Sequence, residues 1–276
     1  MRDFTEPASL SRKIPNPFID DVFTYGKEGN TGAPEVHQRV MSQCISVLET
    51  LIREGDDRHQ WGSMGRCLLI SAPRAGFGKS HLVGRLRSTT ESIIAAVNLP
   101  FDPSRSISWP MVLASVLRQY SDTTCPQNRE CSLMDETSRF FLASLVRASI
   151  LSGSLSDKDC PESEASLRVD YRNIFSRNSK SKILNWVDKR SGELANAASQ
   201  PMKSRWGLGR AEVSFWTGVF VDYTKGYDDA LEPLRGLSNG EARQRMLQFL
   251  RITSECRPIT FIVDHLDGFH GSETAG

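Results

Sequence analysis

The sequence predicts an α/β fold in which a parallel sheet flanked by helices is interrupted by a large helical insertion. Three observations support this prediction. The short apolar run 67–70 is followed at once by a glycine-rich turn and then by residues with helical periodicity. The β-branched run 259–263 has the composition of a parallel strand that is buried on both faces. Between these runs, the apolar residues of 121–257 recur mainly at helical spacing.

The composition is that of a globular protein with an ordinary core. Of the 276 residues, 39% are hydrophobic and 24% are charged. The formal net charge of +1 does not indicate a nucleic-acid partner, although a local basic patch stays open. The most apolar stretch, 140–151, is too short to span a membrane and contains Arg147, and the N-terminus lacks a signal-peptide pattern. We therefore expect a cytoplasmic protein without a membrane partner.

Six cysteines are scattered along the chain, and none belongs to a C-x-x-C pair. This usage indicates reduced thiols, as in cytoplasmic proteins. Cys125 and Cys131 are near enough in sequence to touch, but a zinc site needs two further ligands that the neighbouring sequence does not offer.

The first part of the chain divides into an arm and half of the expected core. Residues 1–60 form the predicted N-terminal arm and a helix. Residues 61–120 form the first half of the core, with strands at 67–70 and 92–99 and helices from Lys79 and over 109–120. Leu82, Val83 and Leu86 share the apolar face of the helix that begins at Lys79.

The rest of the chain divides into an insertion and a helix-strand unit. Residues 121–239 form the predicted helical insertion, and residues 240–276 form a helix followed by the strand 259–263. The apolar spacing predicts helices at 140–151, 165–175, 183–187, 211–223 and 240–252. Three aromatic residues are expected in the core of the insertion: Trp206, Trp216 and Phe220.

The glycine-rich turn has the residue types that bind a polyphosphate. Gly76 and Gly78 let backbone N–H groups approach a phosphate closely, and a helix N-terminus behind them favours negative charge. Lys79 would supply a positive charge to the β- and γ-phosphates, and the Ser80 hydroxyl would ligate magnesium.

This turn matches the pattern G-x-x-x-x-G-K-[ST], except that Pro73 occupies the first glycine position. It follows an apolar run and precedes an amphipathic helix, which is the context that the motif requires. The residues assigned to ATP binding are Ala75, Gly76, Phe77, Gly78, Lys79, Ser80 and His81. The alternative is an ordinary strand–turn–helix with an exposed lysine.

A carboxylate for the magnesium ion is expected at the end of a neighbouring strand. Asp264 directly follows the run 259–263 and is assigned to Mg2+, either directly or through water. Asp267 is assigned to orienting the attacking water, so Lys79 and Asp267 are the predicted catalytic residues. The alternative interpretation of both aspartates is helix capping at a strand–helix turn.

These segments resemble the P-loop ATPases of the AAA+ and STAND groups. The sequence GKSHL at 78–82 is similar to the loop and first helix of AAA+ replication initiators and loaders. The sequence TFIVDHLDG at 260–268 is similar to the Walker B strand of STAND-type and KAP-type ATPases. The resemblance covers 61–120 and 240–270 and implies a P-loop NTPase core. Because the family's sensor, arginine finger and helical lid cannot be placed before Gly276, it also implies a partial sequence that ends just after Walker B.

The resemblance implies an enzyme that binds ATP with magnesium and hydrolyses it to drive a conformational or assembly switch, and it leaves self-association or a protein partner open. A nucleotide-gated scaffold with little hydrolysis is the alternative, because His265 stands where many AAA+ members carry an acid. A small-molecule kinase is a further alternative, but the sequence shows no clear basic lid over an acceptor.

Two other patterns have a simpler interpretation. The sequence GLSNG at 236–240 matches the G-x-S-x-G of hydrolases, but no buried strand precedes it. Ser238 and Glu241 instead predict a capping box at a helix start. The basic stretch 171–190 could touch nucleic acid or an acidic partner, but a solvated helix face with packed aromatic residues is the favoured interpretation.

Overall fold

The computed structural model divides the chain into two compact units. It describes residues 38, 41–47, 49–50, 82, 86, 95–98, 108–125, 128–155, 160–175, 182–257 and 259–262. The first unit comprises residues 1–54 and 65–90, and the second comprises residues 55–64 and 91–276. Most of the described residues belong to the second unit.

The described residues of the first unit are helical. Residues 41–47 and 49–50 are helical, and Met41 and Cys44 are buried. Leu82 and Leu86 are also helical and buried. Because residues four apart lie on one face of a helix, the predicted apolar face is confirmed at these two leucines.

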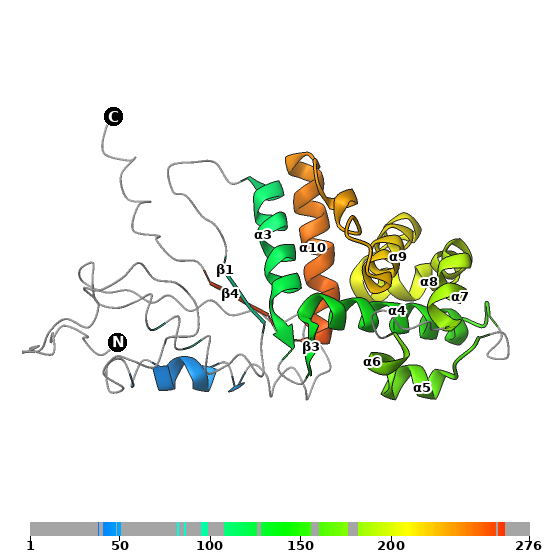
Figure 1. Cartoon of the computed structure of the whole chain (residues 1–276), viewed down its shortest axis with the longest axis horizontal. Helices are drawn as coiled ribbons and strands as arrows, with labels where there is room; N and C mark the ends of the chain where they lie inside the picture. Colours follow the sequence, from blue (N-terminus) through cyan, green and yellow to red (C-terminus); the bar gives the residue numbers. More distant parts are fainter. Residues whose placement is uncertain are drawn as a thin grey trace, which may run out of the picture. The chain divides into compact units, whose positions relative to one another are not determined.

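The second unit is mainly helical (Figure 1). Its longer helices are α3 (Trp109–Asp122), α4 (Leu133–Leu151), α8 (Ser191–Trp206), α9 (Arg210–Lys225) and α10 (Asn239–Cys256). Its shorter helices are α5 (Glu164–Val169), α6 (Tyr171–Ile174), α7 (Lys182–Lys189) and the 3-10 helix η3 (Glu232–Leu234). Helices α8 and α9 pack on each other and on α4, and α3 packs on α10. Within the described residues, no helix combines the length and the apolar character needed to cross a membrane.

Four short strands form two pairs in this unit. Strands β1 (Ala95–Asn98) and β4 (Ile259–Ile262) run parallel, with Ala95 opposite Ile259. Strands β2 (Thr124–Cys125) and β3 (Asn128–Ser132) form an antiparallel pair, with a register shift between Thr124 and Cys125. No pairing among the described strands joins the two pairs into a larger sheet.

The predicted α/β core, with a parallel sheet flanked by helices, is wrong. The described part of the chain is mainly helical, and its parallel pairing joins only two strands of four residues each. Strand β4 is not buried on both faces as expected, since 38% of the Phe261 surface is exposed. The buried apolar residues of the second unit come almost entirely from helices, because these bury their apolar faces against one another.

The helical spacing predicted for 121–257 is confirmed along most of its length. Helices α3, α7, α9 and α10 cover the helices that were predicted at 109–120, 183–187, 211–223 and 240–252, respectively. Helix α4 begins at Leu133 rather than at residue 140, and the single helix expected over 165–175 is divided into α5 and α6 at Asp170. Helix α8 has no counterpart among the predicted helices.

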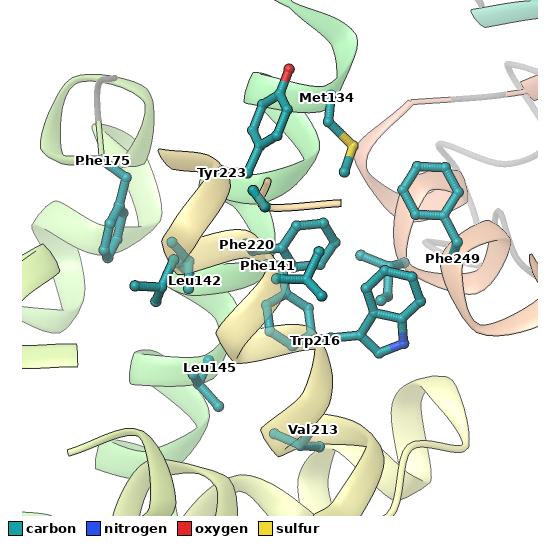
Figure 2. Packing of buried hydrophobic residues seen from close by; sticks show 14 of the residues in the cluster. Met134, Phe141, Leu142, Leu145, Phe175, Val213, Trp216, Phe220, Tyr223 and Phe249 are labelled. Carbon is teal, nitrogen blue, oxygen red and sulfur yellow. The ribbon is translucent and has the colours of Figure 1, made fainter. Parts of the chain in front are cut away.

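Five aromatic rings, here called the aromatic path, connect four helices of the second unit. Figure 2 shows four of them: Phe141, Trp216, Phe220 and Phe249. Phe141 of α4 lies 4.9 Å from Phe220 of α9 between ring centroids. Trp216 stacks on Phe220 at 5.3 Å and lies 5.9 Å from Phe249 of α10. Tyr120 of α3 meets Phe249 edge-on at 5.0 Å. All five side chains are buried, so these helices share one core.

Two local predictions are confirmed in this unit. Trp206, Trp216 and Phe220 are buried in the core, with at most 2% of their surface exposed. At the start of α10, the Glu241 N–H donates to Ser238 Oγ at 3.3 Å, and the Ser238 N–H donates to Glu241 Oε2 at 3.0 Å. The GLSNG sequence is therefore a helix cap, as its context indicated.

Candidate functional site

The residues assigned to ATP and magnesium lie outside the described part of the chain. They are Ala75, Gly76, Phe77, Gly78, Lys79, Ser80, His81, Asp264 and Asp267. Two described features border them in the sequence. Leu82, directly after His81, is helical and buried, and β4 ends at Ile262, two residues before Asp264. The roles of these nine residues stay predictions.

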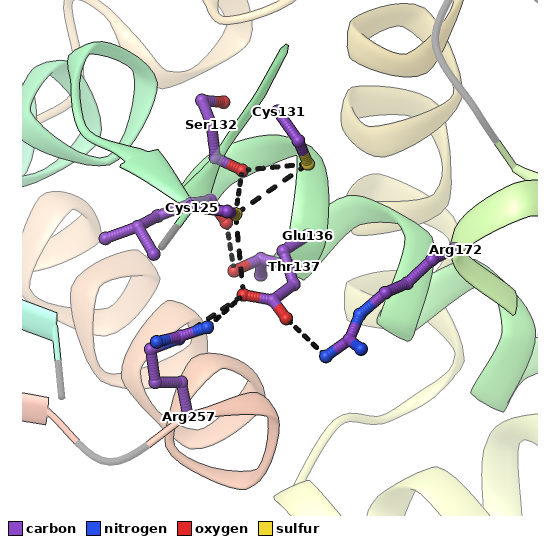
Figure 3. Close-up of polar contacts among 8 residues, drawn as sticks. Cys125, Cys131, Ser132, Glu136, Thr137, Arg172 and Arg257 are labelled. Carbon is purple, nitrogen blue, oxygen red and sulfur yellow. Dashed lines mark hydrogen bonds and ion pairs between the residues drawn. The ribbon is translucent and has the colours of Figure 1, made fainter. Parts of the chain in front are cut away.

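A polar cluster, buried except for Arg172 and the half-buried Ser132, lies where α4 meets the β2–β3 pair and the end of α10 (Figure 3). Its members, here called the Glu136 cluster, are Cys125, Cys131, Ser132, Glu136, Arg172 and Arg257. Sequence reasoning had marked only the two cysteines as neighbours.

A capping box fixes the part of α4 that carries Glu136. The Asp135 N–H donates to Ser132 Oγ at 3.1 Å, and the Ser132 N–H donates to Asp135 Oδ2 at 2.8 Å. These bonds satisfy backbone donors that the first turn of a helix otherwise leaves unpaired. The first turn of α4 is thereby held against the end of β3, and Glu136 follows directly after Asp135.

The Glu136 carboxylate binds two arginines from distant parts of the chain. Its Oε1 accepts from Arg172 Nη2 at 2.7 Å, and its Oε2 accepts from Arg257 Nη2 at 3.1 Å and Nε at 3.3 Å. Only 5% of the Glu136 side chain is exposed. A buried carboxylate is costly unless it is paired, so the two guanidinium groups account for its presence in the core.

The two cysteines of the cluster are in contact, as the sequence suggested. Cys125 Sγ lies 3.7 Å from Cys131 Sγ, 3.1 Å from the Ser132 carbonyl oxygen and 3.6 Å from Glu136 Oε2. Both residues are buried and neither is in a disulfide. The hydrogen bond that the Cys125 thiol donates lowers the pKa of Cys131 and raises the pKa of Cys125.

The chemistry available to this cluster is that of thiols beside charged groups. Among the residues that the structure describes, no group of three or more His, Cys, Asp or Glu side chains is arranged to hold a metal ion. Burial raises the pKa of the neighbouring Cys256 thiol and of the Tyr171 hydroxyl, so neither group ionises readily near neutral pH. Cys131 is the thiol of the pair that the contacts favour in its charged form.

The ion pairs of Glu136 have no signal in the sequence. Arg172 and Arg257 stand 36 and 121 residues from Glu136, so no local spacing links them. In the basic stretch 171–190, Phe175 is buried and Trp186 packs partly against the core. This packing agrees with the interpretation of that stretch as a solvated face with packed aromatic residues.

Comparisons with protein-family models, with curated proteins and with solved structures find no match to this chain. The resemblance to AAA+ and STAND ATPases therefore rests on the residues of the two sequence motifs. Any function for the chain has to be argued from those residues and from their described neighbours.

Proposed function

We propose that this chain binds ATP with Mg2+ and hydrolyses it to drive a change of conformation or assembly. The observation that supports this proposal best is that the sequence Gly78-Lys79-Ser80-His81 runs directly into helical, buried Leu82. A helix immediately behind a G-K-S turn is the context in which backbone N–H groups and the helix dipole hold phosphate.

The position of β4 supports the proposed magnesium ligand Asp264. This strand ends two residues before Asp264 and pairs in parallel with β1, so both strands end at the same edge. An acidic residue just past such a strand is a typical magnesium partner in phosphoryl-transfer sites. Ser80 and Asp264 would hold the ion, and Asp267 would orient the attacking water.

Membership in the AAA+ or STAND ATPases, a cytoplasmic location and action on a second copy or another protein belong to the same proposal. They follow from the motif resemblance rather than from the helical unit. A nucleic-acid partner has little support, because the formal net charge is only +1.

ATP binding is tested by titrating the full chain with MgATP in a calorimeter. Lys79→Ala removes a hydrogen bond to a charged phosphate, which contributes about 1.5–3 kcal/mol, so the affinity should fall about 10- to 100-fold. The control is Lys203→Ala, which removes an exposed lysine on α8 and should leave the affinity unchanged. The proposal fails if both variants bind like the wild type, or if binding does not require magnesium.

Hydrolysis is tested separately, because His265 after Asp264 favours a scaffold that binds ATP without turning it over. Single-turnover phosphate release should occur in the wild type, fall strongly in Asp267→Asn and disappear in Lys79→Ala. If the chain binds ATP but releases no phosphate in a Lys79-dependent way, it is a nucleotide-gated scaffold and not an ATPase. In both cases, bound nucleotide should raise the melting temperature by mass action.

A further inference from the structure

The β2–β3 pair brings two reduced thiols together in the interior of the second unit. Cys125 and Cys131 are 3% and 5% exposed, and their sulfur atoms are 3.7 Å apart. A disulfide needs sulfur atoms about 2.05 Å apart, so a small approach of the two side chains suffices in distance. The register shift between Thr124 and Cys125 makes this end of the pair irregular.

We propose that Cys125 and Cys131 form a redox site, which hydrogen peroxide converts reversibly into an intramolecular disulfide. This site is independent of the ATP-binding residues and goes beyond the proposed ATPase function. Its substrate is a small peroxide, and its product is a crosslink between β2 and β3.

The contacts assign different roles to the two sulfur atoms. The hydrogen bond that Cys125 donates to Cys131 Sγ lowers the pKa of Cys131, and the positive charge of Arg139 also lowers it, whereas burial and the carboxylates of Asp135 and Glu136 raise it. The lowering effects are the stronger, so Cys131 is the sulfur favoured as thiolate. Cys125 keeps its proton, and three acceptors lie within reach of its sulfur: Cys131 Sγ, the Ser132 carbonyl oxygen and Glu136 Oε2. A nucleophilic thiolate beside a protonated thiol is the arrangement that disulfide formation requires.

The reaction balances with one peroxide. The Cys131 thiolate attacks an oxygen of hydrogen peroxide, an S–O bond forms as the O–O bond breaks, and the released hydroxide takes up a proton to become water. Cys125 then attacks the sulfenic sulfur of Cys131, an S–S bond forms as the S–O bond breaks, and the departing oxygen leaves as a second water with the Cys125 proton. Two electrons pass from the sulfur atoms to the peroxide.

A divalent metal is a poorer occupant of this place. The Glu136 carboxylate, which contacts the Cys125 thiol, already binds the guanidinium groups of Arg172 and Arg257. A metal ion there would face two fixed positive charges. A neutral peroxide is not repelled by these charges. It can reach the buried thiols when the β2–β3 pair opens locally, which costs far less free energy than unfolding of the whole unit.

The test uses the full-length reduced protein and hydrogen peroxide at a stoichiometric dose. After quenching and alkylation under denaturing conditions, peptides digested without reductant are analysed by mass spectrometry. We expect a crosslinked peptide that joins Cys125 to Cys131, lighter by two hydrogen atoms and restored by dithiothreitol. The pair should oxidise at least about tenfold faster than Cys44, a buried thiol of the first unit, because reactivity follows thiolate character.

Three variants separate the roles. Cys125→Ser should leave Cys131 as a sulfenic acid that dimedone traps, Cys131→Ser should give no trapped sulfenic acid at Cys125, and Cys44→Ser should form the crosslink like the wild type. Three results with the wild type alone would overturn the proposal, whatever the variants do. The first is that Cys125 and Cys131 both remain alkylatable after peroxide treatment. The second is a crosslink of either residue to a different cysteine. The third is equimolar zinc binding that protects both thiols in the reduced protein.

Discussion

Glu136 holds two arginines whose surroundings differ. The Arg257 side chain is 9% exposed, whereas the Arg172 side chain is 51% exposed. An ion pair that reaches water contributes at most about 1 kcal/mol, while a buried charge that loses its partner costs about 3–5 kcal/mol. The two pairs share one carboxylate, yet they should differ severalfold in their effect on stability.

Glu136→Gln removes the carboxylate charge that the buried Arg257 guanidinium binds. We expect the free energy of unfolding to fall by about 3 kcal/mol, measured by urea denaturation. Arg172→Ala is the matched variant, because it removes the half-exposed pair and keeps the buried one, and it should cost no more than about 1 kcal/mol. Equal losses in the two variants would mean that burial does not set the strength of these pairs.

Helix α8 ends at a glycine with left-handed backbone geometry. Gly207 has φ 68°, its N–H donates to the Lys203 carbonyl at 3.0 Å, and the Leu208 N–H donates to the Met202 carbonyl at 3.4 Å. This arrangement satisfies carbonyl groups that the end of a helix leaves free. A β-carbon at Gly207 would lie 2.6 Å from Arg251 Nη1, but that atom is the end of a flexible side chain and can move aside, so it is the backbone geometry that calls for glycine.

Gly207→Ala should therefore destabilise the protein by about 1–2 kcal/mol, the cost of a left-handed conformation for a residue with a β-carbon. Gly218→Ala is the opposing case, because Gly218 lies inside α9 on the exposed side with nothing within 4 Å of an added β-carbon. It should stabilise the protein by about 1 kcal/mol through higher helix propensity. Thermal denaturation decides the prediction, which is wrong if the two changes have the same sign.

Periodicity predicted the elements whose apolar residues are large, such as α3, α9 and α10. It missed α8, whose buried residues include Ala195 and Ala198 besides Leu194 and Met202, because alanine gives a weak apolar signal. It also missed the β2–β3 pair, where the sequence 128–132 has no alternation of apolar and polar residues. A β-branched run correctly identified β4 as a strand. Composition does not say how many neighbouring strands it has, and the expected sheet rested on the assumption that β4 lies in the middle of several parallel strands.

Sequence reasoning about the sites succeeded only where partners are near in the chain. The contact of Cys125 with Cys131 spans six residues and was visible in the sequence. The binding of Glu136 to Arg257 depends on how α4 packs against the end of α10, and no local pattern encodes that packing. The G-K-S turn is a local motif, so it can be recognised without any tertiary contact. For the same reason it does not determine where Asp264 lies relative to the turn.

The aromatic path should make the helical unit unfold as one cooperative body. Trp216 lies in the middle of this path, between Phe220 and Phe249, and its Nε1 donates to Gln248 Oε1 at 3.0 Å. Removing its indole opens a cavity that faces α9 and α10 together. A local defect at this position would therefore weaken several helices at once.

Trp216→Ala should lower the free energy of unfolding by about 3–5 kcal/mol, as for large aromatic residues in cores. Leu247→Ala on α10 is the control, since Leu247 is 46% exposed, and it should cost less than about 1 kcal/mol. The transitions followed by near-UV and far-UV circular dichroism should coincide in the wild type. Separate transitions for α3 and α10 on one side and α8 and α9 on the other would contradict a shared core.

The pairing of β1 with β4 also sets an order of events during synthesis. β1 leaves the ribosome before every helix from α3 to α10, whereas its partner strand emerges after all of them. The helices make contacts over shorter distances along the chain and can assemble first, because closing a long loop costs entropy before any pairing repays it. For most of translation β1 therefore lacks this partner, so the pairing of β1 with β4 follows the synthesis of all these helices.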